Sequence, residues 1–207
     1  MANEPLQQKP GQQDDTFTTG VILLAAGFSR RFGSIKLNAL LPSGKTVFQQ
    51  TLERIRGATD NILIVTRDEL LDDLLQAGTP LAQTAVCPDA ELGMGHTLAC
   101  GIRHMPAHWD AVLVCLADMP FVETSTYATL LGALRPDVIV VPEHQGKRGN
   151  PVGFGGKWFT TLAQASGDSG GREVMKGNPD AILRVPVEDP AVHLDVDVPG
   201  DLGQHRV

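Results

Sequence analysis

The sequence predicts one α/β domain built on a mostly parallel sheet. Short apolar runs alternate along the chain with longer segments of helical spacing, and a repeated strand-then-helix order implies a parallel sheet covered by helices. The length of 207 residues suits a single domain, since domains commonly contain roughly 100–200 residues. Apolar residues make up 42% of the chain and charged residues 20%, which excludes the low-hydrophobicity, high-charge composition of a disordered chain.

The short apolar runs are each bounded by Gly, Asp or Pro, as buried strands commonly are. They cover Val21–Ala25, Ile62–Thr66, Ala111–Leu116 and Val138–Val141. The longer segments carry apolar residues on one helical face, for example Val47, Leu52 and Ile55. The predicted helices cover Thr46–Arg56, Asp68–Gln76, Gly95–Met105 and Glu123–Leu134. The predicted order is β-α-β-α-β-α-β-α-β up to Val141.

The two ends of the chain differ from this pattern. The first 19 residues contain no apolar stretch of signal-peptide type, so we expect 1–19 to form a disordered tail and 20–207 to form the domain. The later part of the chain is rich in glycine at Gly146–Gly156 and at Gly167–Gly171. Short strand candidates follow at Ile182–Val185 and Val192–Val196. We expect this part to belong to the same domain.

Charge and cysteine usage exclude several classes of protein. The formal net charge of -7 argues against a general nucleic-acid-binding surface, so an anionic substrate must meet a local cationic site. Cys87, Cys100 and Cys115 lie in apolar segments without C-x-x-C spacing, which predicts buried reduced thiols and a cytoplasmic location. No apolar run approaches the roughly 20 residues needed to span a bilayer, so no membrane partner is expected.

The turn Gly27–Gly33 follows the first predicted strand and is a candidate phosphate-binding segment. In open parallel sheets, ligands bind outside the carboxyl ends of the strands. The turn contains two glycines, Ser29, Arg30 and Arg31, with Lys36 shortly after. Glycine lets backbone N–H groups approach phosphate oxygens, and the basic residues neutralise charge. The spacing matches neither G-x-x-x-x-G-K-[ST] nor G-x-G-x-x-G, and an ordinary strand-to-helix turn is the alternative.

Aspartates at two places form a candidate metal site. Asp118 follows the strand Ala111–Leu116, and Asp195 and Asp197 lie near the C-terminus. Hard cations such as Mg²⁺ bind carboxylate oxygens and keep waters and substrate phosphates as further ligands. If the later segment is extended, Asp195 and Asp197 face the same side of it. For Asp118 alone, a helix cap is the alternative.

Two further segments are glycine-rich and carry polar side chains. Gly93 and Gly95 precede a helix that starts near His96 or Thr97, and a helix N-terminus offers free N–H groups to anions or base edges. An ordinary helix start with Thr97 near the cap is the alternative. Two later loops carry Lys147, Arg148, Asn150, Asp168 and Arg172 among their glycines. They can approach a bulky ligand, or they can be flexible surface connections.

Six segments of the chain resemble, in this order, the nucleotidyltransferase family of the molybdenum cofactor cytidylyltransferases and their guanylyltransferase relatives. They are LAAGFSRRFGSIK, GMGHTLACGI, LADMPFV, KRGNPVGFG, GDSGGR and DVDVPGDL, spanning about Val21–Leu202. The family pattern L-A-[AG]-G-x-S-x-R-[MF]-G-x-x-K is matched from Leu24 to Lys36, with Ile35 where a proline is usual. The resemblance implies a three-layer α/β/α Rossmann-like nucleotidyltransferase fold.

The resemblance also implies roles for residues of this sequence. Lys36, Arg31 and Asp118 would be catalytic, and Mg²⁺ would be bound by Asp118 with Asp195 or Asp197. The acceptor would contact Asn150, Pro151, Asp168, Gly170 and Arg172. The nucleotide would contact Leu24, Ala25, Ala26, Gly27, Ser29, Arg31, Lys36, Gly93, Gly95, His96 and Thr97.

The implied reaction is attack by the terminal phosphate of a molybdopterin-type cofactor on the α-phosphorus of Mg-CTP, with release of pyrophosphate. LAAG and G-M-G are similar to the cytidylyl branch, whereas the guanylyl branch tends to carry LAGG, so CTP is favoured over GTP. His96, Thr97 and Asn150 replace residues usual in the cytidylyl branch. The alternatives are guanylyl transfer to the same cofactor, a sugar-phosphate or isoprenoid nucleotidyltransferase, and a non-catalytic carrier that delivers the cofactor to a molybdoenzyme.

Overall fold

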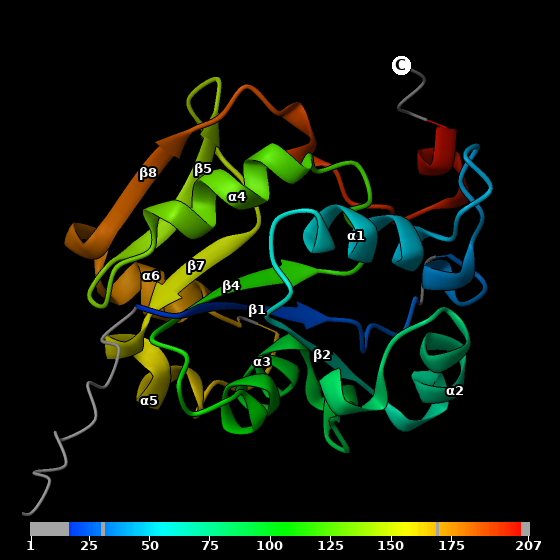
Figure 1. Cartoon of the computed structure of the whole chain (residues 1–207), viewed down its shortest axis with the longest axis horizontal. Helices are drawn as coiled ribbons and strands as arrows, with labels where there is room; N and C mark the ends of the chain where they lie inside the picture. Colours follow the sequence, from blue (N-terminus) through cyan, green and yellow to red (C-terminus); the bar gives the residue numbers. More distant parts are fainter. Residues whose placement is uncertain (1–16, 30–31, 169, 204–207) are drawn as a thin grey trace, which may run out of the picture.

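A computed structural model describes residues 17–29, 32–168 and 170–203, and these residues form an eight-stranded sheet with helices on both faces (Figure 1). The strand order is β3-β2-β1-β4-β7-β5-β6, and β8 pairs with β5. The strands are β1 Thr19–Leu24, β2 Ile62–Thr66, β3 Thr84–Val86, β4 Ala111–Leu116, β5 Ile139–His144, β6 Lys147–Arg148, β7 Val152–Gly155 and β8 Ile182–Pro186. The helices are α1 Val47–Arg56, α2 Asp68–Gln76, α3 Met94–His104, α4 Thr124–Ala133, α5 Phe159–Leu162 and α6 Arg172–Gly177.

The sheet is mostly parallel, which confirms the predicted fold class. β1 pairs in parallel with β2 and β4, β2 pairs in parallel with β3, and β5 pairs in parallel with β8. β7 is antiparallel to both β4 and β5. Leu24, the last residue of β1, is in register with Val65 and Leu116. The segments that follow β1 and β4 therefore leave the sheet at the same edge.

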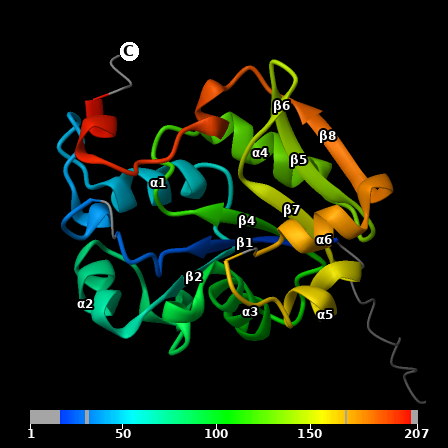
Figure 2. The ribbon, with the colours of Figure 1, turned by 180° about the vertical axis from the view of Figure 1, so that it is seen from behind.

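Alternation along β1 divides the core between the two faces of the sheet. Val21 and Leu23 belong to one apolar cluster, together with buried residues of α1, α2 and α4. Ile22 and Leu24 belong to a second cluster, together with buried residues of α3, α5 and α6. Figures 1 and 2 show α1 and α4 on one side of the sheet and α3 and α5 on the other. This arrangement is the predicted three-layer α/β/α architecture.

The helices begin and end close to their predicted bounds, and local signals explain why. Thr46 caps α1: its hydroxyl accepts from the Gln49 N–H at 3.1 Å, while the Gln49 side chain accepts from the Thr46 N–H at 3.0 Å. This reciprocal pair is a capping box. α2 covers the predicted residues and has two acidic residues in its first turn, which suits the positive end of the helix dipole.

The structure differs from the prediction at two places. Val192–Val196 is not a strand: Pro190–His193 forms a 3₁₀ helix instead, because the Asp189 carboxylate accepts from the Ala191 N–H and proline suits the first helical position. Thr19, assigned to the tail, is the first residue of β1, and the Thr18 N–H donates to Asp110 at 2.8 Å. Residues 1–16 of the predicted tail lie outside the described residues.

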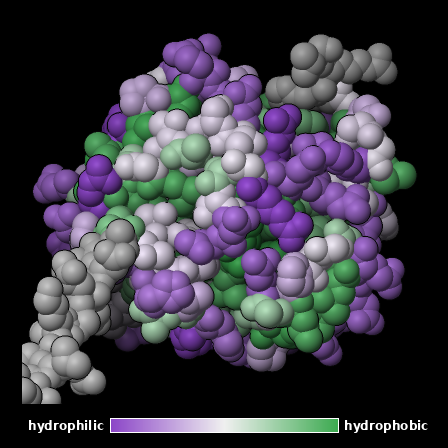
Figure 3. Space-filling view, in the orientation of Figure 1, coloured by the Kyte–Doolittle hydropathy of each residue, from purple (hydrophilic) through white to green (hydrophobic). Residues whose placement is uncertain are grey.

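Figure 3 shows hydrophilic and hydrophobic residues interspersed over the face seen in Figure 1. Of the helices that the structure describes, none has the length and apolar character needed to cross a membrane.

Candidate active site

A cavity of about 500 Å³ lies where the segments after β1 and β4 meet. The predicted edge of the sheet therefore carries a hollow large enough for a ligand. Its lining comes from the β1 turn, the start of α3, the end of β4 and the C-terminal segment. The lining residues are Leu24–Ser29, Lys36, Leu37, Ala90–Met94, Thr97, Leu116–Asp118, Asp168, Asp195 and Asp197.

The turn after β1 places backbone groups at the cavity wall. The Ala25 N–H donates to the Val65 carbonyl at 2.8 Å. This is the last bond of the sheet pattern along this segment, and the turn begins after it. A Cβ atom on Gly27 would meet no atom of the described residues within 4 Å, so these residues leave space for a ligand beside this backbone. The Ser29 hydroxyl accepts from the Lys36 N–H at 3.1 Å and closes the turn onto the 3₁₀ helix Lys36–Asn38. Arg31, predicted to be catalytic, lies outside the described residues.

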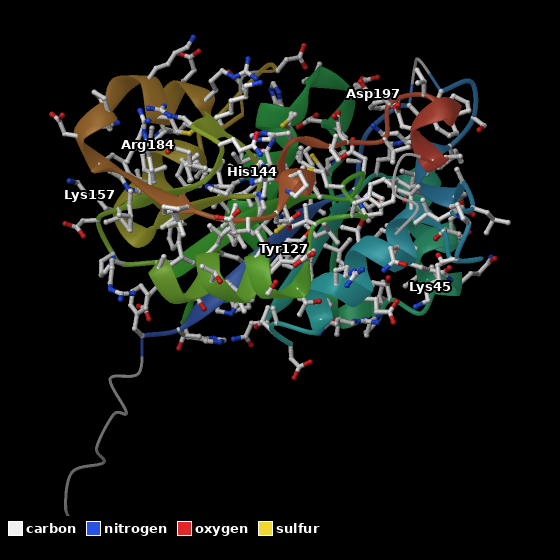
Figure 4. All side chains as sticks on the ribbon, turned by 90° about the horizontal axis from the view of Figure 1, so that it is seen from above. Lys45, Tyr127, His144, Lys157, Arg184 and Asp197 are labelled. Atoms are coloured by element: carbon white, nitrogen blue, oxygen red, sulfur yellow. The ribbon has the colours of Figure 1, made fainter. Side chains whose placement is uncertain are left out.

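Three carboxylates meet at the foot of the cavity. Asp118, Asp195 and Asp197 each offer an oxygen, and these oxygens all lie within 4.8 Å of one another. The ammonium of Lys36 lies 2.5 Å from Asp118 Oδ2 and 3.4 Å from Asp197 Oδ1. Figure 4 shows Asp197 on the C-terminal segment, drawn in red, beside the blue segment that follows β1. The structure thus brings together side chains from three distant parts of the sequence.

Among the residues that the structure describes, negative charge exceeds positive charge at this end of the cavity. Burial is the largest effect on Lys36 and lowers its pKa, but attraction to Asp118 and Asp197 outweighs burial and the pKa is raised. The pKa of Asp195 is also raised, first by burial and then by repulsion from Asp118 and Asp197. Three carboxylates face one ammonium, so a bound divalent cation would neutralise the remaining charge.

The donor set fits a hard divalent cation. Asp118 Oδ1 is buried and has no hydrogen-bond partner among the described residues. A buried polar atom without a partner is rare and calls for a ligand, an ion or water. Carboxylate oxygens are what Mg²⁺ and Mn²⁺ prefer. The alternative role of Asp118 as a helix cap is wrong, because Glu123 is the N-cap residue of α4.

Backbone contacts position the two C-terminal carboxylates. Val196, between them, is fully buried, and its N–H donates to the Asp118 carbonyl at 2.8 Å. Asp195 and Asp197 therefore point away from the core on the same side, as predicted. Asp201, which sequence reasoning missed, accepts from the Asp197 and Val198 N–H groups at 2.9 Å, and these bonds lower its pKa.

Asp189 is a second missed residue, and it anchors the same segment from the other end. Its carboxylate is 5% exposed and accepts from the Glu123 N–H, the Thr126 hydroxyl and the Ala191 N–H at 2.8–2.9 Å. It thus joins the start of α4 to the segment that leads to Asp195. The Asp-Pro pair was the available signal, because Asp before Pro favours a local turn.

We expect Asp189→Ala to lower the free energy of unfolding by about 2–4 kcal/mol, because two buried donors and one partly buried donor lose a charged acceptor. Urea unfolding followed by circular dichroism measures this change. Asp180→Ala is the control, since Asp180 is exposed and should change stability by no more than about 0.5 kcal/mol. Equal stability of the two variants would contradict the anchoring role of Asp189.

The start of α3 divides the residues predicted to bind the nucleotide into two groups. Gly93 and Thr97 line the cavity, but Gly95 and His96 are not among the lining residues that the structure describes. The Gly95 N–H donates to the Gly167 carbonyl at 2.7 Å, and His96 Nδ1 accepts from the Gly167 N–H at 3.2 Å. Gly95 and His96 instead hold the loop around Gly167. A Cβ on Gly95 would lie 2.5 Å from the Ser166 carbonyl oxygen, so this close approach requires glycine.

The residues predicted to contact the acceptor are also divided. Asp168 lines the main cavity, whereas Asn150 and Arg172 line a second hollow. Pro151 and Gly170 are buried and line neither of these two hollows. The Asn150–Pro151 peptide bond is cis.

Apolar side chains at the cavity were not predicted. Phe28, Leu92 and Met94 line it and are 39%, 53% and 46% exposed. The guanidinium of Arg67, the N-cap residue of α2, lies 4.2 Å from the centre of the Phe28 ring. Such a pair is a cation–π contact and holds the ring in place. A nucleobase could pack against these apolar side chains.

A parallel α/β sheet that ends in a turn of this kind, with a lysine and clustered carboxylates beside it, has the architecture of the nucleotidyltransferases. Comparison with known families agrees, since the model of the MobA-like NTP transferase domain matches residues 21–183. The chain belongs to this family.

Relatives of the chain extend this result. The chain is 30% identical over 196 residues to the purine catabolism protein PucB of Bacillus subtilis, covering 89% of this chain and 94% of PucB. It is 34% identical over 113 residues to a probable molybdenum cofactor guanylyltransferase of a Geobacillus species, covering 53% of this chain and 54% of that protein. Its structure is similar to that of Rv0371c from Mycobacterium tuberculosis in complex with manganese, with a TM-score of 0.71, 25% identity and coverage of 90% and 96%.

Proposed function

We propose that this chain transfers CMP from Mg-CTP to the terminal phosphate of a molybdopterin-type cofactor and releases pyrophosphate. The observation that carries the proposal is the meeting of Asp118, Asp195 and Asp197 with Lys36 beside the turn after β1. The resemblance to the cytidylyl branch and the guanylyltransferase relative support the choice of acceptor. Ala26, the second alanine of LAAG, supports CTP.

The nucleotide would occupy the 500 Å³ cavity. Backbone N–H groups of Ala26 and Gly27 would face its phosphates, and Lys36 would neutralise charge that moves onto the leaving pyrophosphate. The attacking phosphate is already an anion, so no protein base is needed. The work of the chain is positioning and charge neutralisation.

Asp118 with Asp195 or Asp197 would hold Mg²⁺. When bound, the metal supplies charge that draws the α-phosphate and the attacking phosphate together. The manganese complex of Rv0371c is consistent with a divalent cation in this fold. We further propose that a molybdoenzyme receives the product. We also propose a cytoplasmic location, because all three cysteines are free and buried.

Guanylyl transfer to the same cofactor is the second candidate, favoured by the relative of 34% identity. The test offers Mg-CTP, Mg-GTP and Mg-UTP, each alone and with molybdopterin, a sugar phosphate or an isoprenoid phosphate, and measures both ligand binding and pyrophosphate release. We expect release only when CTP and acceptor are both present. If pyrophosphate were released only with GTP, the nucleotide substrate would be GTP and not CTP. Tight binding without any release would contradict the enzyme and support a carrier, and release only with a sugar phosphate or isoprenoid phosphate would replace the acceptor.

Magnesium affinity should fall as the pH is lowered from neutral to mildly acidic values. The pKa of Asp195 is raised by burial and by its two carboxylate neighbours, so this group takes up a proton at a higher pH than an ordinary aspartate. The proton then competes with the metal. The same raised pKa means that the metal-free fold gains stability from Asp195 as the pH falls.

Titration of the protein with Mn²⁺, followed by electron paramagnetic resonance at several pH values, measures this effect. Asp195→Asn is the matched variant, and its affinity should be lower but less dependent on pH. The same pH dependence in both proteins would show that Asp195 is not the titrating group.

A further inference from the structure

The loop that follows α5 is bonded to α3 near both of its ends. The Arg103 guanidinium donates to the Ala163 carbonyl at 2.9 Å, and the Gly95 N–H donates to the Gly167 carbonyl at 2.7 Å. We call residues 163–168 the latched loop. Because these bonds reach from α3 to both ends of the latched loop, the position of the loop follows that of the helix.

His96 provides a further bond to the latched loop, and this bond depends on its side chain. The Gly167 N–H donates to His96 Nδ1 at 3.2 Å. Nδ1 therefore carries no proton, and the proton of the neutral ring is on Nε2. A ring of similar size without a nitrogen would leave the Gly167 N–H without this acceptor. His96 thus fixes the residue immediately before Asp168.

The latched loop places Asp168 at the wall of the main cavity. Asp168 and Gly93, the residue before α3, both line that cavity. A Cβ on Gly93 would lie 2.6 Å from Asp168 Oδ1, so the carboxylate is close to the backbone at the start of α3. A negative charge is stabilised there by the positive end of the helix dipole. Among the described residues, Asp168 does not belong to the group of three carboxylates at the foot of the cavity.

The carboxylate of Asp168 limits which part of a nucleotide can lie beside it. An ionised carboxylate accepts hydrogen bonds and donates none. It repels phosphates, which Lys36 and a divalent cation attract at the foot of the cavity. The nucleoside part, by contrast, carries donors, namely the ribose hydroxyls and the amino group of cytosine. Asp168 is therefore suited to the nucleoside part.

We propose that His96 is a positioning residue, which holds the latched loop so that the Asp168 carboxylate accepts a hydrogen bond from the nucleoside part of the bound nucleotide. This inference rests on the proposed function, which places a nucleotide in the main cavity. It gives both residues roles that differ from those implied by the resemblance. His96 acts through the loop instead of touching the nucleotide, and Asp168 contacts the nucleotide instead of the acceptor.

Hydrogen exchange in the ligand-free full chain tests the bond to His96. The Gly167 amide, followed by NMR, should exchange about fivefold faster or more in His96→Phe, because it loses one hydrogen bond. His96→Asn should restore slow exchange, since its amide oxygen can take the place of Nδ1. His108→Phe is the control and should change nothing, because His108 is exposed and lies beyond the end of α3. Equal exchange in the wild type and in His96→Phe would overturn the proposal.

A double-mutant cycle tests the link to the nucleotide. Mg-CTP is titrated by calorimetry without any acceptor. His96→Phe and Asp168→Ala should each weaken binding about tenfold or more, as expected for a hydrogen bond to a charged group. The double variant should bind no more weakly than Asp168→Ala, because His96 acts through Asp168, and His96→Asn should bind as the wild type does. Additive losses, or wild-type affinity in Asp168→Ala, would overturn the proposal.

Nucleotide analogues identify the donor that Asp168 bonds. Mg-UTP lacks the amino group of cytosine, and the magnesium complex of 2′,3′-dideoxy-CTP lacks both ribose hydroxyls. Asp168→Ala should leave the affinity for one of these analogues unchanged, and the group missing from that analogue is the donor. An equal loss with CTP and with both analogues would overturn the hydrogen bond.

Failure of the proposed function would give a different result. A wild type that binds Mg-GTP but not Mg-CTP would contradict the proposed nucleotide. The same cycle with Mg-GTP, which also carries ribose hydroxyls and a base amino group, would then decide the roles of His96 and Asp168. Binding of neither nucleotide would overturn both the proposed function and this inference.

Discussion

Asp118→Asn should reduce pyrophosphate release by about 10²–10³-fold, which corresponds to about 3–4 kcal/mol of lost transition-state stabilisation. Asp118 provides the buried oxygen without a partner and lies within 4.8 Å of the other two carboxylates. An amide cannot replace that charge at a divalent cation. The variant should stay folded, because Asp118 lies beyond the end of β4 and is not part of the apolar core.

Single-turnover release of pyrophosphate measures the loss, and Mn²⁺ titration measures metal affinity. Asp137→Asn is the control: Asp137 is exposed, and the change should leave both quantities as in the wild type. Near wild-type turnover in Asp118→Asn would sink the metal assignment.

Lys36→Met should lower turnover by a similar factor of about 10²–10³ but should not weaken metal binding. Lys36 now lies 2.5 Å from Asp118 and 3.4 Å from Asp197, so its ammonium competes with a cation for the same oxygens. Its removal takes away a competitor for the metal and a group that would neutralise the leaving pyrophosphate. The two variants therefore separate the roles of metal ligand and phosphate ligand.

The same two measurements apply, with Lys45→Met as the control. Lys45 is 45% exposed and pairs with Glu53 on the surface of α1, so its loss should leave turnover and metal affinity unchanged. If Lys36→Met lost Mn²⁺ binding as fully as Asp118→Asn, the division of roles would be wrong.

Most of the strands that the sequence predicted well are buried on both faces, whereas β8, predicted as Ile182–Val185, contains no buried residue. All five residues of β2 are buried, and such a run of apolar residues has no other place in a folded chain. β3 completes the predicted order, although no range was assigned to it. The antiparallel strand β7 was not predicted, because its glycine-rich sequence, VGFG, is more typical of a loop.

The glycines of β7 serve close packing rather than flexibility. A Cβ on Gly153 would lie 2.5 Å from Leu134 Cδ2, and one on Gly155 would lie 2.2 Å from the Arg135 carbonyl oxygen. No periodicity in a single sequence reveals such a neighbour, since the contact depends on how α4 and the following turn cross the sheet. A glycine in a strand can indicate that another part of the chain approaches closely, but the sequence does not say which part.

The candidate site likewise contains residues that the sequence could identify and residues that it could not. Asp118, Asp195 and Asp197 could be proposed together because carboxylates after strands and in an extended segment converge at one edge of a parallel sheet. His96 could not be placed, because its bond to Gly167 joins the first turn of α3 to an irregular loop 71 positions further along the chain. Asp189 and Asp201 support the site through backbone N–H groups, and such bonds leave little trace in residue spacing.

The loop at Gly149 and Asn150 is bonded directly to the segment that carries the C-terminal carboxylates. The Asn150 N–H donates to the Val192 carbonyl at 2.8 Å, and a Cβ on Gly149 would lie 2.5 Å from that same oxygen. An acceptor that displaces this loop would also displace Val192 and the approach to Asp195. An acceptor that binds well but shifts this loop would therefore be disfavoured in the turnover step itself.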